Sequence, residues 1–137
     1  MACVLDVSVS LAWYLPGQGD PYATEIYRRL NAGELRASAP VLWRTELASV
    51  LLKACRRHEI TEKHGCSALT DAEALPVALN DLQLTAVELY RLGRRYNLSG
   101  YDVHYLELAR RLDLPIATSD RGIRSAARAH RIALYGA

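Results

Sequence analysis

The chain has 137 residues, of which 50% are hydrophobic and 23% are charged, and its formal net charge is +2. These values are ordinary for a folded globular protein and exclude intrinsic disorder, collagen-like repeats and a coiled coil. No apolar run approaches the ~20 residues that cross a membrane, and so small a net charge does not by itself indicate nucleic-acid binding. We expect one folded domain over residues 1–137.

The first part of the chain alternates between strand and helix patterns. Pro16 ends a helical pattern, and Asp20 followed by Pro21 is typical of a helix start, with a capping side chain and proline in the first turn. In order, we predict a strand over 2–5, a helix over 8–15, a helix from Asp20 to near Gly33, a strand over 35–39 and a helix that carries Trp43 to Ala54.

The second part continues the alternation. We predict a helix opened by Thr61, a strand over 77–79, a helix from Asp81 to Tyr96, a helix from Ser99 to about Leu112, a strand over 115–118, a helix from Asp120 to His130 and a closing strand over 132–134. Short strands separated by helices favour parallel pairing through right-handed crossovers. The predicted class is therefore α/β: three layers, with a central parallel sheet of four to five short strands flanked by helices.

Two aspartates follow predicted strands directly. Asp6 comes after the first strand and Asp120 after the fourth. In a parallel sheet, ligands bind beyond the carboxyl ends of the strands, where the strand order reverses. If both strands are central, these carboxylates meet at that edge. Each aspartate also has a simpler interpretation, because an aspartate between a strand and a helix often serves only as a helix cap.

Two further acids lie at the starts of predicted helices. Asp102 stands three positions after Ser99, which is a capping-box spacing and also suits the helix dipole. Glu46 borders the apolar stripe of its helix, next to Trp43. Its head group is then either solvated, with the stem packed against the core, or partly buried beside a cation.

Four carboxylates in one place would repel one another and take up protons. A hard divalent cation removes that cost, and a site made only of oxygen atoms suits Mg²⁺ or Mn²⁺. Such ions activate water and stabilise the charge that develops during phosphodiester cleavage. Ser8 and Thr118 flank the first and last acids, where they would orient a carboxylate or a water, or serve only as caps and packing. The four histidines show no ligand spacing that indicates zinc.

Arginine dominates the basic residues. Fifteen of the 17 are arginines, many of them in adjacent pairs, and arginine makes forked contacts to phosphate that lysine cannot make. Arg121 and Arg124 in the last helix are candidates for contacts to the phosphates of a nucleic acid. A bias toward arginine on solvated helix faces is the alternative.

The cysteines indicate a reducing compartment. Cys3, Cys55 and Cys66 are widely spaced and form no Cys-x-x-Cys pair, and the first residues lack the pattern of a secretory signal. We therefore expect reduced thiols in a cytoplasmic protein.

Four segments together resemble one family. They are VLDVS at 4–8, WRTELASVL at 43–51, LSGYDVHYLELA at 98–109 and LPIATSDR at 114–121. The combination is similar to the PIN domain, and more narrowly to the VapC toxins of prokaryotic type II toxin–antitoxin systems. The likeness extends almost end to end. Val7 departs from it, since the family often has a hydroxyl residue there, but no acid is lost.

The resemblance implies a PIN-like fold and an endoribonuclease that depends on Mg²⁺ or Mn²⁺ and cleaves structured RNA, often tRNA or ribosomal RNA. The family's acids fall on Asp6, Glu46, Asp102 and Asp120, which would be both the metal ligands and the catalytic residues. It also implies a homodimer and inhibition by a VapB-type antitoxin. The alternative is a PIN module that binds RNA or a protein without cutting; loss of one of the acids would be its signature, and all four are present.

Two other classes with alternating strands and helices fail on single residues. A phosphoacceptor receiver domain needs a lysine after its last strand, whereas the only lysines here are Lys53 and Lys63. A phosphoaspartyl phosphatase needs a second aspartate two positions after Asp6, where Ser8 stands.

Overall fold

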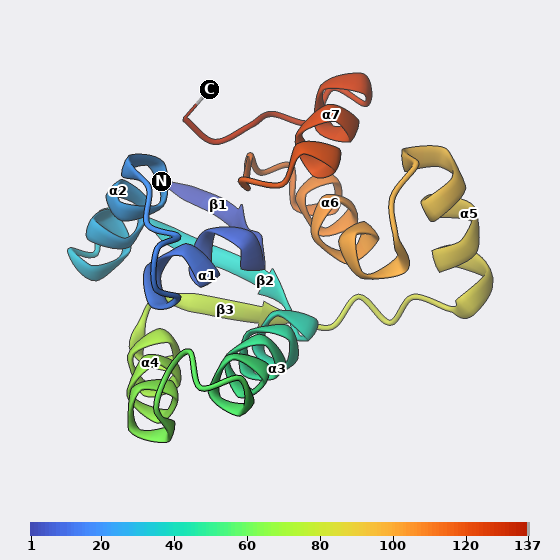
Figure 1. Ribbon diagram of the computed structural model, residues 1–137. Coiled ribbons are helices and arrows are strands. Elements are labelled where there is room, and N and C mark those ends of the chain that lie inside the picture. The colour runs from blue at the N-terminus through green and yellow to red at the C-terminus, as the bar shows by residue number, and fades with distance from the viewer. Residues whose placement is uncertain (137) are drawn as a thin grey trace.

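A parallel four-stranded sheet organises the computed structural model, which describes residues 1–136 (Figure 1). In chain order the elements are β1 (Ala2–Leu5), α1 (Val7–Tyr14), α2 (Pro21–Asn31), β2 (Arg36–Pro40), α3 (Leu42–Arg56), α4 (Glu62–Ala74), β3 (Val77–Asn80), α5 (Ala86–Tyr96), α6 (Gly100–Leu112), β4 (Ile116–Ala117) and α7 (Arg121–Ala129). Helices and strands alternate broadly as the sequence patterns predict.

The strand order is β3-β2-β1-β4, and every neighbouring pair is parallel. The chain moves outward from β1 through β2 to β3 and then returns to the other side of β1 for β4. On that side Val4 pairs with Ile116 and Leu5 with Ala117. The strand order therefore reverses between β1 and β4, and the side chains that follow these two strands lie at the reversal point.

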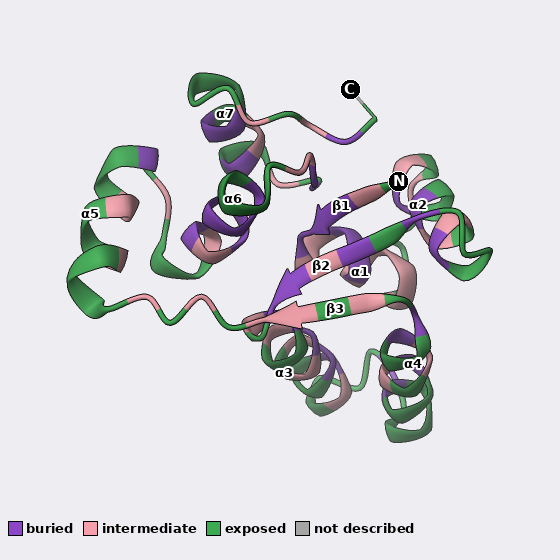
Figure 2. Ribbon diagram, turned by 180° about the vertical axis from the view of Figure 1, so that it is seen from behind, coloured by how far each residue is buried: buried purple, intermediate pink, exposed green. Residues whose placement is uncertain are grey.

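Helices cover both faces of the sheet, which confirms the predicted three layers. Figures 1 and 2, taken from opposite sides, show α1 with α2 and α3 on one face. On the other face α6 contacts β1 and β2, and α5 and α7 pack against α6. Buried residues concentrate in β1, β2 and β4 and along α6, whereas edge strand β3 is half-buried or exposed (Figure 2). None of the helices in residues 1–136 is long and apolar enough to cross a bilayer.

Capping side chains start the helices where the sequence predicted them. Asp20 Oδ1 accepts a hydrogen bond from the amide of Ala23 at 2.8 Å, and Thr61 Oγ1 accepts one from His64 at 3.0 Å. Asn97 ends α5 in the left-handed conformation, with φ of 56°. These bonds satisfy backbone groups that a helix end would otherwise leave unpaired.

The predicted helix over Asp81–Tyr96 is wrong in its first turn. Helix α5 begins only at Ala86, because Thr85 forms a complete capping box with Glu88. The Thr85 hydroxyl accepts from the Glu88 amide at 3.1 Å, and the Glu88 carboxylate accepts from the Thr85 amide at 3.3 Å. Before it, Asp81 accepts from the amide of Gln83, whose φ of 51° breaks the helical path.

The predicted closing strand over 132–134 is also wrong. The segment meets the sheet at a single bridge between Ile116 and Leu134, so the sheet has four strands in the described residues. Strand β4 is itself shorter than the predicted 115–118. It has only two residues, because Thr118 turns toward the end of β1, and so gives a fifth strand little to pair with.

Candidate active site

The carboxyl edge of the sheet brings together the four acids that the sequence singled out. Asp6 and Asp120 follow the paired strands β1 and β4, and the amide of Asp6 donates to the carbonyl of Ala117 at 2.9 Å. Glu46 lies in the second turn of α3, and Asp102 in the first turn of α6. Asp102 lies close enough to each of the other three that their charges influence one another.

Asp6 is buried, with 2% of its surface exposed, and two hydroxyl groups hold it in place. Its Oδ2 accepts from Ser8 Oγ at 2.5 Å and from Thr118 Oγ1 at 2.8 Å. The two hydroxyls accept in turn from the amides of Ser119 and Asp120, each at 3.0 Å. Ser8 and Thr118 thus orient the carboxylate and tie the end of β1 to the end of β4.

Asp120 caps α7, as its simpler interpretation predicted, but this role uses only one of its oxygens. Oδ1 accepts from the amide of Ile123 at 2.8 Å. Asp102 differs, because its own amide donates to Ser99 Oγ at 3.2 Å. Burial and the neighbouring charges, which raise the pKa of Asp102, outweigh a hydrogen bond with Ser99 that acts to lower it. The capping interpretation therefore accounts for only part of Asp120 and part of Asp102.

Glu46 is partly buried, and a phenol contacts it. The Tyr105 hydroxyl donates to Glu46 Oε1 at 2.7 Å. No lysine, arginine or histidine within residues 1–136 forms an ion pair with Glu46, nor with any of the three aspartates. Protein cations therefore do not neutralise this group of carboxylates.

Burial and mutual repulsion make negative charge costly here. Burial raises the pKa of Asp6 to about 6, against hydrogen bonds from Ser8 and Thr118 that lower it, and the charge of Asp102 adds to the rise. The pKa of Asp102 is raised by burial first and then by the charges of Asp120 and Glu46. Groups perturbed in this way gather at functional sites, and a divalent cation would reverse the penalty.

The donor set fits a hard cation in its chemistry. Within residues 1–136 each of the four carboxylates keeps at least one oxygen that accepts no hydrogen bond from the protein, among them Asp6 Oδ1. No enclosed side-chain oxygen or nitrogen in that range lacks a partner, so these free oxygens reach solvent. No three His, Cys, Asp or Glu side chains of the described residues yet surround one point as ligands. Coordination of an ion by these carboxylates would require them to lie closer together than they do here.

Some arginines form ion pairs with glutamates, whereas Arg121 and Arg124 form none within residues 1–136. Arg28 and Arg29 form ion pairs with Glu25, and Arg110 and Arg111 with Glu107, so these two pairs serve the fold. Near the acids, Arg124 donates through Nη1 to the carbonyl of Thr118 at 2.8 Å, and the neighbouring Arg121 is exposed.

Tyr105 and Glu107 are buried polar side chains of α6 that escaped the sequence interpretation. Tyr105 follows Asp102 by three positions, and that spacing places both on one face of α6; the sequence carries this signal. Glu107 lies in the same helix and is buried by its contacts with Tyr96, Arg110 and Arg111. Only the arginines at three and four positions after Glu107 hinted at its pairing.

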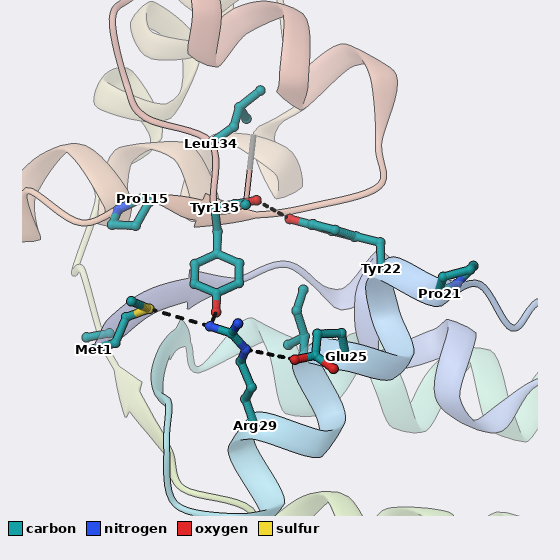
Figure 3. A pocket seen from close by; sticks show the side chains of 11 residues that line it. Met1, Pro21, Tyr22, Glu25, Arg29, Pro115, Leu134 and Tyr135 are labelled. Atoms are coloured by element: carbon teal, nitrogen blue, oxygen red, sulfur yellow. Dashed lines mark hydrogen bonds and ion pairs between the residues drawn. The ribbon is translucent and has the colours of Figure 1, made fainter.

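A separate cavity of about 700 Å³ lies at the opposite, amino edge of the sheet (Figure 3). It lies between the start of β1, helix α2 and the segment around Tyr135. Its polar groups are already paired: Arg29 contacts Glu25 and the Tyr135 hydroxyl, and the Tyr22 hydroxyl donates to the Tyr135 carbonyl at 2.9 Å. We therefore locate the candidate active site at the acidic edge.

Comparison with known proteins agrees with this geometry. The family model of the PIN domain matches residues 3–129. Two relatives, both named Ribonuclease VapC1 and from two strains of Mycobacterium tuberculosis, are 31% identical over 126 residues, which cover 90% of this chain and 90% of theirs. The solved structure of PAE2754 from Pyrobaculum aerophilum shares the fold, with a TM-score of 0.64, 17% identity and coverage of 92% of this chain and 84% of that one.

The chain belongs to the PIN domain family. Within that family its similarity to the two Mycobacterium tuberculosis proteins places it in the VapC group.

Proposed function

We propose that this protein is an endoribonuclease toxin that depends on Mg²⁺ or Mn²⁺ and cleaves structured RNA, either tRNA or ribosomal RNA. One observation carries the proposal: four carboxylates converge at the carboxyl edge of the sheet, each with a free oxygen and none paired with a protein cation in residues 1–136. The ribonuclease names of the two relatives support the choice of RNA.

The contacts of each acid indicate its role. One or two ions would be bound through the free oxygens of Asp6, Asp102 and Asp120. The hydroxyls of Ser8 and Thr118 would hold the Asp6 carboxylate in its orientation. Glu46 would bind a second ion or hold the attacking water with the oxygen that Tyr105 leaves free. When bound, the ion supplies positive charge that neutralises the acids, favours ionisation of water and stabilises the phosphate as it is attacked. In-line attack by water leaves 5′-phosphate and 3′-hydroxyl ends.

The last helix offers contacts for the RNA backbone. Arg121 is exposed and follows Asp120 directly, so it can reach a phosphate that flanks the cleaved bond. Arg124 uses Nη1 for the Thr118 carbonyl, and its guanidinium lies 5.9 Å from the centroid of the Tyr22 ring, which leaves its positive charge unpaired by any carboxylate of the described residues. We propose that both bind phosphate, with Arg124 also holding the end of β4 in place.

The similarity to VapC proteins extends the proposal to partners. A VapB-type antitoxin would inhibit the enzyme by covering the acidic edge, and the protein would act as a homodimer. Because the proposed substrate is cellular RNA and the three cysteines are unpaired, we propose that the protein acts in the cytoplasm.

Asp120→Asn tests the function with little structural cost, because asparagine caps a helix as well as aspartate does. We expect the wild type to cleave tRNA or ribosomal RNA with Mg²⁺ or Mn²⁺ and to stop when EDTA is added. The variant should bind Mn²⁺ at least tenfold more weakly in isothermal titration and lose cleavage, with an unchanged melting temperature. Cleavage by the wild type that persists in EDTA would refute metal dependence. RNA binding without any cleavage would instead identify a binding module.

A further inference from the structure

The Tyr105 side chain has 0% of its surface exposed, yet its hydroxyl reaches the edge of the acidic site. The hydroxyl donates to Glu46 Oε1 at 2.7 Å and so joins α6 to α3. Tyr105 also lies close enough to Asp6 and Asp102 to feel their charges. One helix therefore provides both a carboxylate of the site, Asp102, and the phenol that contacts another.

Glu46 depends on this contact more than the aspartates depend on theirs. Asp6 is fixed by two hydroxyls and Asp120 by a backbone amide. Glu46 has the longest side chain of the four, with three rotatable bonds, and within residues 1–136 the Tyr105 hydroxyl is its only hydrogen-bond donor. Without that donor, no hydrogen bond from the described part of the chain would select one orientation of the Glu46 carboxylate.

The chemistry of the donor matters as well. A lysine or arginine beside Glu46 would hold it but would also neutralise it, and would compete with a metal ion for the same charge. A phenol donates one hydrogen bond and carries no charge, so it orients the carboxylate and leaves its negative charge available. A buried phenol is suited to this role because the surrounding core fixes its ring.

We propose that Tyr105 is a positioning residue of the active site: its hydroxyl fixes Glu46 Oε1, so that Oε2 is the oxygen presented to the cation and the water. This inference rests on the proposed nuclease function and assigns a further residue to the same site.

Tyr105→Phe removes the hydroxyl and keeps the ring. Because loss of a group that holds a metal ligand typically costs 10–100-fold in metal affinity or activity, we expect Mn²⁺ affinity in isothermal titration to fall about tenfold or more. The kcat for RNA cleavage should fall by a similar factor while KM for RNA changes little, because the contacts to phosphate remain. Unchanged or tighter Mn²⁺ binding would overturn the proposal.

Tyr96→Phe is the matched control. Tyr96 also donates from a buried phenol to a glutamate on α6, at 2.8 Å, but that glutamate is Glu107, which lies outside the acidic site. Its loss should lower the melting temperature and leave Mn²⁺ affinity unchanged. If both variants weaken Mn²⁺ binding equally, the effect of Tyr105 is one of general stability, and the positioning role is wrong.

A double variant shows whether Tyr105 acts through Glu46 or independently of it. In a Glu46→Gln background, Tyr105→Phe should cause no further loss of Mn²⁺ affinity or kcat. A further tenfold loss would show that Tyr105 acts on its own and would overturn the proposal. A wild type that neither binds Mn²⁺ nor cleaves RNA would instead refute the proposed function on which this inference rests.

A measurement on the wild type covers the case in which Tyr105→Phe does not fold. With tyrosine labelled at ¹³Cζ, Mg²⁺ should move the NMR signal of Tyr105 and leave that of Tyr96 in place. A Tyr105 signal that does not respond to saturating Mg²⁺ would overturn the proposal.

Discussion

Glu107 provides a measurable test of how a buried carboxylate stabilises this fold. It is 1% exposed and accepts hydrogen bonds from Tyr96 at 2.8 Å, from two nitrogens of Arg110 at 2.8 and 2.7 Å, and from Arg111 at 2.9 Å. Burial alone would raise the pKa of Glu107, but these donors outweigh burial and lower it from 4.5 to about 2. One pKa unit corresponds to about 1.4 kcal/mol, so the ionised form contributes about 3 kcal/mol to stability.

Glu107→Gln keeps the size of the side chain but removes the charge and turns an amide donor toward the donors of Arg110 and Arg111. We expect the free energy of unfolding to fall by about 3 kcal/mol near pH 7. The folded pKa lies below the unfolded one, so the contribution is complete above the unfolded value and is lost as the pH falls toward the folded value. The difference between wild type and variant should therefore shrink to less than half by about pH 3. Urea denaturation at both pH values measures it.

Glu25 offers a control with the same spacing. It pairs with Arg28 and Arg29, three and four positions later, as Glu107 pairs with Arg110 and Arg111, but it is exposed to solvent. Solvent screens such pairs, so Glu25→Gln should change stability little at either pH. The reasoning fails if Glu107→Gln costs no more than Glu25→Gln, or if its cost is the same at both pH values.

Two further substitutions test local contacts, one at the acidic site and one in helix α5. Thr118→Val removes a hydroxyl that donates to Asp6 and accepts from the amide of Asp120. It should lower the free energy of unfolding, measured by urea denaturation, by about 1–3 kcal/mol. Thr24→Val, which changes an exposed hydroxyl on α2, is the control, and a loss at Thr118 no larger than the loss at Thr24 would contradict this account. Gly93→Ala places a Cβ 3.1 Å from the Leu98 carbonyl oxygen and should lower the melting temperature despite the higher helix propensity of alanine. Gly100→Ala, which meets nothing within 4 Å, should not lower it.

Local sequence signals predicted much of the fold, because capping residues and apolar periodicity act over a few positions. Asp20 and Ser99 start helices where predicted. The helix expected from Asp81 begins later because a second start signal, Thr85 with Glu88, lies within the predicted range. The hydrogen bonds of that capping box set the first residue of the helix. The strand expected over 132–134 did not form because a strand needs a neighbouring strand to pair with. The neighbouring strand, β4, has only two residues, and the sequence of 132–134 itself carries no information about the length of β4.

The candidate site was predictable where topology determines it. Parallel pairing of β1 with β4 is enough to bring Asp6 and Asp120 to one edge. The partner of Glu46 was not predictable, because the contact with Tyr105 spans 59 positions and depends on how α3 and α6 pack. That residues 1–137 form one domain, and that the four acids bind metal, remain predictions.

The hydroxyl relay between Ser8 and Thr118 joins groups 110 positions apart in the chain. Thr118 is synthesised 112 positions after Asp6, and Asp120 follows it. A nascent chain that ends before Thr118 has Asp6 without the Thr118 hydroxyl to hold it and lacks Asp120. If the protein cuts RNA, we therefore expect the nascent chain to be inactive until Asp120 has been synthesised.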